Sequence, residues 1–351
     1  MTRVQQESSV GYKYGRVNSL GSSGSVRVFG LSDGPSEAVV IEENGDLVGF
    51  GESAAGSLKF RSTGVSFSKY FRPQTATQVP DKIGAALRAC GMAENMTSGT
   101  YKAATYTLDN SFAPYTGSSA DSSGNPVQAI DITVNRGKDQ VNNTGIQEIL
   151  KDCVGNAVIH FRAGQRAWAD FTFIGRINSS LATAQTTSMT SDTAPTAFVA
   201  EAKPLTTSNA SVSFAGVAAP GLRVLEANYD LGNQIEMRED FNGDIGGFSV
   251  PQIVGRQTSC DVLIESPLIS TLDMFTKLLD NQTALTVVGT HAAGTSYGSE
   301  MAWTWAMVPK ALRMETVKGI QCIRVIGQQY VTNTTTIAYG TPLALTYLPQ
   351  A

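Results

Sequence analysis

The chain has 351 residues, of which 42% are hydrophobic and only 16% are charged. A chain of this length buries at least one sizeable core and has room for two domains. Its formal net charge of −4 excludes the strongly basic surface with which proteins grip nucleic acid. Because no apolar run reaches the ~18 residues of a membrane span and residues 1–15 contain no signal-peptide core, we expect assembly in a cytoplasm.

Residues 1–25 are polar and rich in Ser and Gly, which predicts an N-terminal arm that contributes little to a core. From Val26 onward, short apolar runs predict strands. Asn44-Gly45 separates two of them, 39–41 and 47–50, and this dipeptide favours a type I′ hairpin turn. Alternating apolar residues predict half-buried strands through 58–60 and 65–67.

A short helix is expected from Pro80 to Cys90. Ile83, Leu87 and Cys90 recur at helical spacing, and Gly91 suits the position after the last turn. Strands are expected to resume afterwards, at 101–108, 130–134, 157–162 and 167–174.

Residues 186–211, rich in Thr, Ser and Ala, predict a linker between two domains. A second helix is expected from Pro267 to about Asp280, because its apolar residues form one stripe, which must pack on a sheet: Leu268, Leu272, Phe275 and Leu279. The remaining apolar runs predict strands at 212–214, 222–225, 260–264, 285–288, 301–307, 311–317 and 320–326.

Both halves of the chain follow the same plan of strands, one helix, more strands and a closing hairpin that ends on an apolar residue and Gly. Ile174-Gly175 and Ile326-Gly327 are those two endings. Such self-similarity indicates duplication. We therefore expect a mostly β protein with two tandem β-sandwich or barrel-like domains, 26–185 and 212–351, each with one short amphipathic helix.

The neighbouring residues argue against each catalytic or metal-binding motif in the sequence. Gly294 to Gly298 fits G-x-S-x-G, but a strand pattern follows it where a nucleophile elbow requires a helix. Asp240, Asn242 and Asp244 resemble the start of a calcium loop, yet Ile245 occupies the position that requires Gly, so we expect a turn. His160 reads as a packed strand residue. The four cysteines are isolated, which favours buried reduced thiols: Cys90, Cys153, Cys260 and Cys322.

Several segments, in this order, resemble the major tail tube proteins of siphophages. They are Ile83 to Met92, Gly155 to Val158 with Ala163-Gly164 and Phe171 to Gly175, Leu231 to Asn233 with Arg238 to Asp240, Arg256 before Cys260, and Asp273 to Leu279. The matches run from about Val65 to Ile326. The chain departs from the family in a long polar insertion, Asn110 to Gln128, and in the segment Asn135 to Leu150.

The resemblance implies a structural subunit of the virion tail that is not an enzyme and takes no cofactor or metal. Its partners would be further copies of itself in stacked rings, together with tail terminator, tail tip and tape measure proteins. Two domains per chain would let three chains close a pseudo-sixfold ring, with a hexamer as the alternative. Such a tube, assembled in the bacterial host cytoplasm, would pass genomic DNA through its lumen without specific binding.

Four acidic residues on the polar stretch after Leu231 are candidates for the lumen wall, because an acidic wall would keep DNA from sticking: Glu236, Glu239, Asp240 and Asp244. A solvated outer loop explains them equally well. From a different class of function, the alternative is a surface β-sandwich adhesin or carbohydrate-binding module. Aromatic side chains exposed on loops would favour it, whereas Trp168, Trp303 and Trp305 lie inside strand patterns.

Overall fold

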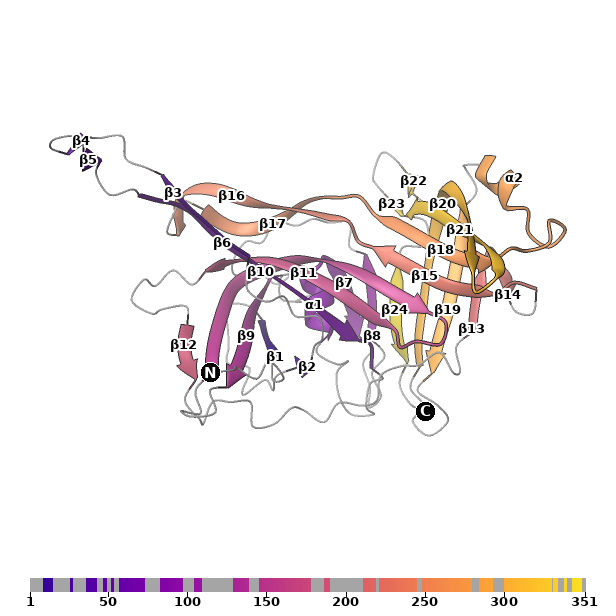
Figure 1. Cartoon of the computed structure of the whole chain (residues 1–351), viewed down its shortest axis with the longest axis horizontal. Coiled ribbons are helices and arrows are strands. Elements are labelled where there is room, and N and C mark those ends of the chain that lie inside the picture. Colours follow the sequence, from indigo (N-terminus) through magenta and orange to yellow (C-terminus); the bar gives the residue numbers. More distant parts are fainter. Residues whose placement is uncertain are drawn as a thin grey trace.

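Antiparallel strands dominate the computed structural model, and two short helices, α1 (Ile83–Ala89) and α2 (Met274–Leu279), interrupt them (Figure 1). The structure describes residues 9–14, 26–27, 36–42, 47–48, 52–53, 57–72, 83–96, 104–108, 129–138, 145–177, 186–189, 211–218, 221–244, 248–279, 284–292, 300–329, 331–333, 338–339 and 343–348. The protein is therefore mostly β with a large antiparallel sheet, as the composition predicts.

The strands before residue 190 are β1 (Ser9–Tyr14), β2 (Val26–Arg27), β3 (Ser36–Glu42), β4 (Leu47–Val48), β5 (Glu52–Ser53), β6 (Ser57–Tyr70), β7 (Met92–Met96), β8 (Ala104–Leu108), β9 (Ile130–Lys138), β10 (Gly145–Arg162), β11 (Trp168–Ile177) and β12 (Thr186–Met189). Those after it are β13 (Ser211–Phe214), β14 (Val217–Ala218), β15 (Val224–Asp230), β16 (Asn233–Asp244), β17 (Phe248–Arg256), β18 (Ser259–Glu265), β19 (Leu285–Ala292), β20 (Glu300–Val317), β21 (Ile320–Gln329), β22 (Val331–Asn333), β23 (Ala338–Tyr339) and β24 (Ala344–Leu348).

Two strands of 18 residues each, β10 and β20, organise the sheet. One edge of β10 pairs first with β9 and then with β15, while its other edge pairs with β12 and then β11. The first half of β20 lies between β19 and β24, and its second half pairs with β21. Each long strand therefore changes neighbours along its length, which lets one sheet serve two parts of the core.

Each long strand also contains an irregularity where its neighbours change. The register of β10 with β11 shifts between Lys151 and Val154, and Asp152 there has a φ of 51°. The register of β20 with β21 shifts between Pro309 and Ala311. Bulges of this kind bend a strand and increase its twist, and Pro at such a site removes no regular ladder bond.

The core is built from the inward residues of these strands, with many aromatic side chains. The Phe67 ring lies 5.6 Å from that of Phe171, its cross-strand partner on β11. Tyr229 of β15 meets Trp305 of β20 edge to face at 5.4 Å, and its hydroxyl donates to Gln329 at 2.8 Å. Phe161 of β10 stacks on Trp303 of β20 with centroids 4.1 Å apart, which joins strands from both halves of the chain into one packed interior.

The helix α1 confirms the expected helix around Ile83 to Cys90. Ile83, Leu87 and Cys90 are fully buried, and the helix contacts β1, β7, β8, β9 and β10. Gly91 follows it with a φ of 77°, the left-handed conformation that glycine adopts most easily at a helix end.

The second expected helix is wrong in length and in packing. It begins at Met274 because Asp273 caps it, accepting hydrogen bonds from the backbone N–H groups of Phe275 and Thr276 at 3.1 Å each. Leu272 and Met274 are buried, whereas Leu268 is 75% and Phe275 is 55% exposed. Leu272 of the predicted apolar stripe is therefore buried, but Leu268 and Phe275 do not pack on the sheet.

Other strand expectations need correction at particular places. The segment 39–41 belongs to β3, which pairs with β6, and β4 pairs with β5, so the two strands flanking Asn44-Gly45 do not form the expected hairpin with each other; that dipeptide lies outside the described residues. Part of Asn135 to Leu150 extends β9 and β10. Residues 186–189, expected in a linker, form β12 on the edge of β10.

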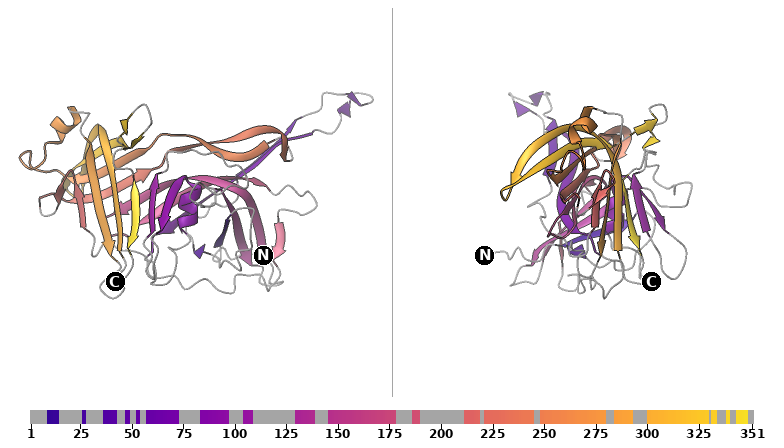
Figure 2. Two further views of the ribbon diagram at one scale, coloured as in Figure 1. Left: turned by 180° about the vertical axis from the view of Figure 1, so that it is seen from behind. Right: turned by 90° about the vertical axis from the view of Figure 1, so that its right-hand side faces the viewer.

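The polar stretch after Leu231, expected as a loop or turn, forms β16 and pairs with β17 as a long hairpin. This hairpin lies across β10 and β11, as both Figure 1 and the rear view in Figure 2 show. Amphipathic alternation is weak in these residues, so composition alone suggested a loop.

Candidate functional site

Asn233 fastens the base of the β16–β17 hairpin to the rest of the molecule. Its Nδ2 donates to the carbonyl oxygens of Cys90 at 2.7 Å and of Gly155 at 2.9 Å. Its backbone N–H donates to Asn156 Oδ1 at 3.0 Å. One side chain thus connects the hairpin to the end of α1 and to β10.

Arg256, the residue opposite Asn233 in the hairpin, completes this cluster. Its Nε donates to Asn233 Oδ1 at 2.8 Å, and its Nη2 donates to the carbonyl of Gly91 at 3.0 Å. A Cβ at Gly91 would lie 2.5 Å from Arg256 Nη2. Glycine at 91 therefore serves both the helix end and the approach of the guanidinium.

We call Cys90, Gly91, Gly155, Asn156, Asn233 and Arg256 the hairpin anchor. Four segments from positions far apart in the sequence meet in it: the end of α1, the middle of β10, the start of β16 and the end of β17. The spacing of these segments in the sequence does not predict that they meet. Most of the acceptors in the hairpin anchor are backbone carbonyls, and these do not appear in a pattern of side chains.

A second polar cluster lies on one face of the sheet around Arg324 of β21. Its guanidinium donates to Glu315 at 2.8 Å, to Asp261, and to Glu226 at 3.2 Å, on strands β20, β18 and β15. These carboxylates raise the pKa of Arg324, most of all through the hydrogen bond that Arg324 donates to Glu315, and Arg324 in turn lowers the pKa of Glu315. Glu226 also pairs with Arg162 of β10 at 2.9 Å.

The same face continues across the junction of β10 with β15. His160 Nδ1 lies 2.9 Å from Asn228 Oδ1, and His160 Nε2 lies 3.0 Å from Asp170 Oδ2. Asn228 Nδ2 donates to Asp261 at 3.2 Å, which joins this group to the Arg324 cluster. His160 is thus a packed strand residue as expected, but one inside a network that spans several strands.

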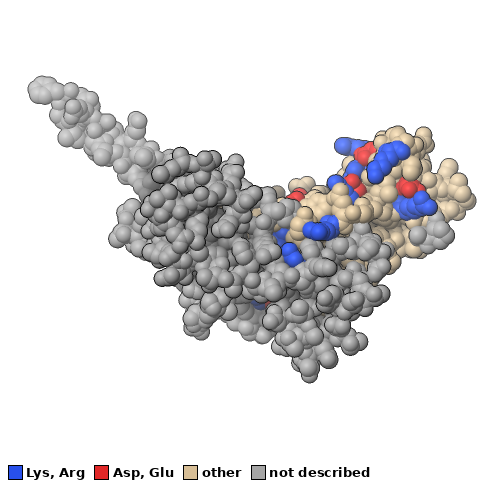
Figure 3. Space-filling view, turned by 60° about the horizontal axis from the view of Figure 1, so that its bottom comes forward, with Lys and Arg blue, Asp and Glu red and all other residues tan. Residues whose placement is uncertain are grey.

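Side chains of both signs are interspersed on the coloured part of the surface in Figure 3, at the end of the molecule where β20 and β21 lie. The polar face is therefore mixed in charge. Sequence reasoning missed it, because each strand contributes only one or two of its members, and these become a network only through the register of the sheet.

The four candidate lumen residues all fall on β16. Glu236 is exposed and pairs across the hairpin with Gln252. Glu239 and Asp244 both lie opposite Phe248, at an irregularity of the ladder; the side chains of Glu239, Asp240 and Asp244 are outside the described part. The hairpin brings these positions onto one strand and not into the Arg324 cluster.

Several strands have an unpaired edge among the described residues, β7, β12 and β14 among them; two further unpaired edges belong to β20 and β3. Residues 311–317 of β20 pair with β21 on one side only. Strand β3 likewise pairs with β6 on one side only. Exposed edges present free N–H and C=O groups and are templates for pairing with another chain.

Within the described residues, no three His, Cys, Asp or Glu side chains are grouped so as to hold a metal ion. The G-x-S-x-G match lies outside the described part, and β20 follows it from Glu300. All four cysteines are free and buried, as expected, and burial raises the pKa of the Cys90 and Cys260 thiols. Neither helix has the length and hydropathy needed to cross a membrane.

Trp303 and Trp305 are buried, and Trp168 stacks on His160 with ring centroids 4.8 Å apart. These three side chains therefore belong to the interior and the polar network, as their strand patterns predict. No model of a known protein family matches this sequence, and no curated protein matches it.

Proposed function

We propose that the chain is a structural subunit of a bacteriophage tail tube, with two tandem β domains that assemble into stacked rings around a hollow conduit for DNA. The observation that carries the proposal is that one scheme of strand pairing occurs twice along the chain, together with unpaired edges where a further repeat would join.

The two sets of elements correspond in order and in partners. β3, β6, α1, β9, β10 and β11 are matched by β15, β18, α2, β19, β20 and β21. In each set, the strand before the helix pairs with the last strand, β6 with β11 and β18 with β21. The long strand pairs with the last strand and with the strand that precedes the long strand in sequence: β10 pairs with β11 and β9, and β20 pairs with β21 and β19. Each set also has an inserted hairpin between its first two strands, β4–β5 or β16–β17.

The lengths of the long strands and of the closing strands agree as well. The long strands β10 and β20 both have 18 residues, and the closing strands β11 and β21 both have 10. The bulge of β10 lies opposite Gly175, and the bulge of β20 lies next to the partner of Gly327. Duplication of one domain would give both halves the same strand lengths and bulge positions. Two halves of independent origin would have no reason to share them.

Within one chain, the two sets are joined where the end of β10 pairs with β15. The corresponding strands at the outer ends are β20 and β3, and each of them has an unpaired edge. Pairing β20 of one copy with β3 of the next would repeat the internal junction. Such a head-to-tail interface closes a ring when its rotation closes, and it removes the exposed edges.

The internal junction also fixes the register of the proposed one. Ile174 and Ile326 are equivalent positions in the two sets, and they pair with Val154 and Ala311. Five residues further along each long strand, Ile159 of β10 corresponds to Thr316 of β20. On their other side, Ile174 pairs with Gly64, and Ile326 pairs with Asp261. Gly64 pairs in turn with Ser36, and Asp261 pairs with Asn228. The next residue along each strand is Glu37 or Tyr229, so these two correspond.

Ile159 pairs with Tyr229 in the chain. Thr316 is therefore proposed to pair with Glu37 of the neighbouring copy. Three chains with two domains each would give the pseudo-sixfold ring, with six chains as the alternative.

Stacking of rings, and contact with tail terminator, tail tip and tape measure proteins, would use surfaces at the two ends of the ring. The candidate lumen residues Glu236, Glu239, Asp240 and Asp244 are proposed to face DNA, which would pass without specific binding. The virion tail is then the place where the protein acts, after assembly in the host cytoplasm.

The test is assembly of edge variants. Ala157 and Ala163 bond to β15 through their backbone carbonyl and N–H groups, and in an antiparallel ladder every second residue faces the same neighbour. Ile159 therefore faces β15, and the N–H of Thr316 faces the unpaired edge. Thr316→Pro removes that donor and spares the ladder with β21, whereas Thr316→Val keeps it.

Wild-type protein and Thr316→Val are expected to form rings or tubes in negative-stain micrographs, and Thr316→Pro is expected to stay monomeric with an unchanged circular dichroism spectrum. A wild-type protein that stays monomeric at high concentration would contradict the tail tube proposal. Rings formed by Thr316→Pro would place the ring contact elsewhere.

A further inference from the structure

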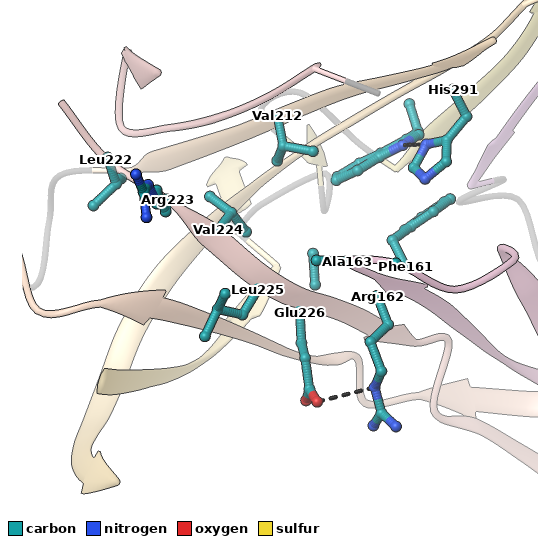
Figure 4. Close-up of a pocket in the computed structure, with 13 residues that line it drawn as sticks. Phe161, Arg162, Ala163, Val212, Leu222, Arg223, Val224, Leu225, Glu226 and His291 are labelled. Atoms are coloured by element: carbon teal, nitrogen blue, oxygen red, sulfur yellow. Dashed lines mark hydrogen bonds and ion pairs between the residues drawn. The ribbon is translucent and has the colours of Figure 1, made fainter. Parts of the chain in front are cut away.

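A cavity of about 310 Å³ lies where the end of β10 and the turn after it meet β13, β15, β19 and β20 (Figure 4). Cavities of this size bind small molecules in many proteins. None of its lining residues belongs to the unpaired edges of β3 or β20, so the cavity is independent of the proposed ring contact.

The cavity walls are mainly apolar. Phe161 and Trp303 stack face to face with centroids 4.1 Å apart, and this aromatic stack forms part of the wall. Val212 and Leu222 contribute further apolar surface. At one side, Arg162 is held by Glu226, as the dashed line in Figure 4 marks. The third charged residue of the lining, Arg223, is 68% exposed and pairs with Glu265 outside the cavity at 3.7 Å. Each charged group of the lining thus has a partner of opposite charge, and the site suits an uncharged molecule.

One polar group among these walls lacks a partner. His291 is 1% exposed and lines the cavity with its ring turned toward it (Figure 4). Trp303 Nε1 donates to His291 Nδ1 at 3.0 Å. Because an indole N–H only donates, Nδ1 is the accepting nitrogen, and burial lowers the pKa of His291 to about 4.

The neutral ring therefore carries its proton on Nε2. That atom is buried and has no hydrogen-bond partner in the described structure. An unsatisfied buried donor is costly, and an acceptor brought into the cavity would remove this cost. The cavity thus combines apolar and aromatic walls with one buried donor, His291 Nε2, that has no acceptor in the described structure.

We propose that this cavity binds a small uncharged molecule with a planar apolar body and a carbonyl oxygen, which accepts a hydrogen bond from His291 Nε2. The apolar body packs against the stack of Phe161 and Trp303. The acceptor distinguishes ligands from hydrocarbons of the same shape, because only the former satisfy His291.

A pair of probes tests this directly. Acetophenone has an aromatic ring and a carbonyl oxygen, and ethylbenzene has nearly the same shape without an acceptor. Binding of each to the full chain is measured by isothermal titration calorimetry and by ligand-observed NMR. Acetophenone is expected to bind with a Kd of ~1 mM or tighter, and about fivefold to tenfold more tightly than ethylbenzene.

Variants assign the effect to the cavity. His291→Phe keeps an aromatic ring but lacks the donor, so the preference for acetophenone should disappear while ethylbenzene still binds. His160→Gln, which changes the histidine of the polar face outside the cavity, should leave the preference unchanged.

Failure of acetophenone to bind, equal affinity for the two probes, or a preference that persists in His291→Phe would each overturn the proposal. The comparison of the two probes on wild-type protein stands even if a variant does not fold. Ring assembly is not involved in any of these measurements, so their outcome does not depend on the tail tube proposal.

Discussion

Asn233 Nδ2 lies 2.7 Å from the carbonyl oxygen of Cys90, although 143 residues separate the two in sequence. The contact joins the first residue of the β16–β17 hairpin to the end of α1. Because Arg256 binds both Asn233 and the next carbonyl, that of Gly91, the hairpin is held at its base by two side chains acting together. The position of the whole hairpin over β10 and β11 follows from this anchor.

Replacement of Asn233 by Ala is expected to lower the free energy of unfolding by about 3 kcal/mol, since it leaves two partly buried carbonyls and Arg256 Nε without their partner. Gln234→Ala, at the neighbouring exposed position, is expected to change it by less than about 0.5 kcal/mol. Urea unfolding followed by tryptophan fluorescence measures both. Similar losses in the two variants would show that the anchor contributes little.

Two glycines with positive φ predict a contrast in steric cost. Gly232 has a φ of 61°, and a Cβ there would lie 1.9 Å from the carbonyl oxygen of Gln257. Gly216 has a φ of 79° with nothing within 4 Å of a Cβ. Gly216→Ala should therefore cost only the ~1 kcal/mol of left-handed backbone, whereas Gly232→Ala should cost well beyond that, because backbone must shift. Thermal unfolding of the two variants gives the comparison.

Arg324 is expected to stabilise the polar face through its three carboxylate partners. Arg324→Gln leaves Glu226, Asp261 and Glu315 close together without their shared cation, and we expect a loss of about 2 kcal/mol. Arg223 is the matched control. It is 68% exposed and has one contact with Glu265 at 3.7 Å, so Arg223→Gln should cost less than about 0.5 kcal/mol. Equal costs in urea unfolding would contradict this account.

His291 predicts a specific pH dependence of stability. Its pKa is lowered from 6.5 to about 4 by burial, so the unfolded chain binds a proton at a higher pH than the folded chain. Stability from this group is full above pH 6.5 and is lost as the pH falls toward 4, by about 3 kcal/mol in total. In His291→Phe, the fall in unfolding free energy between pH 6.5 and 4 should be smaller than in wild type. Identical slopes would mean that His291 titrates normally.

Local patterns predicted the elements well where one face of a strand or helix is buried. Met301, Trp303, Trp305 and Met307 alternate along β20 and are all buried, and α1 shows its helical spacing. The pattern of α2 misled for a physical reason. Leu268 and Phe275 share a helical stripe with Leu272, yet a cap at Asp273 delays the helix and leaves both exposed.

The sequence did not predict the hairpin anchor or the polar face, for a different physical reason. Asn233 binds carbonyls, which every residue possesses, and the partners of Arg324 lie on three other strands. Pairing register decides such contacts, and β16 itself was expected to be a loop because its residues are polar. Periodicity reports which face of an element is buried, not which elements become neighbours.

The acidic positions on β16 give the most direct test of a conduit for DNA. Replacement of Glu236, Glu239, Asp240 and Asp244 by Lys changes the charge of each position by two units and would attract phosphates. Phage carrying these substitutions should assemble tails but eject DNA more slowly and less completely, and added salt should partly restore ejection because it screens the attraction. Neutral replacements, Gln for Glu and Asn for Asp, should have a much smaller effect. Normal ejection by the Lys variant at low salt would show that these residues lie away from the path of the DNA.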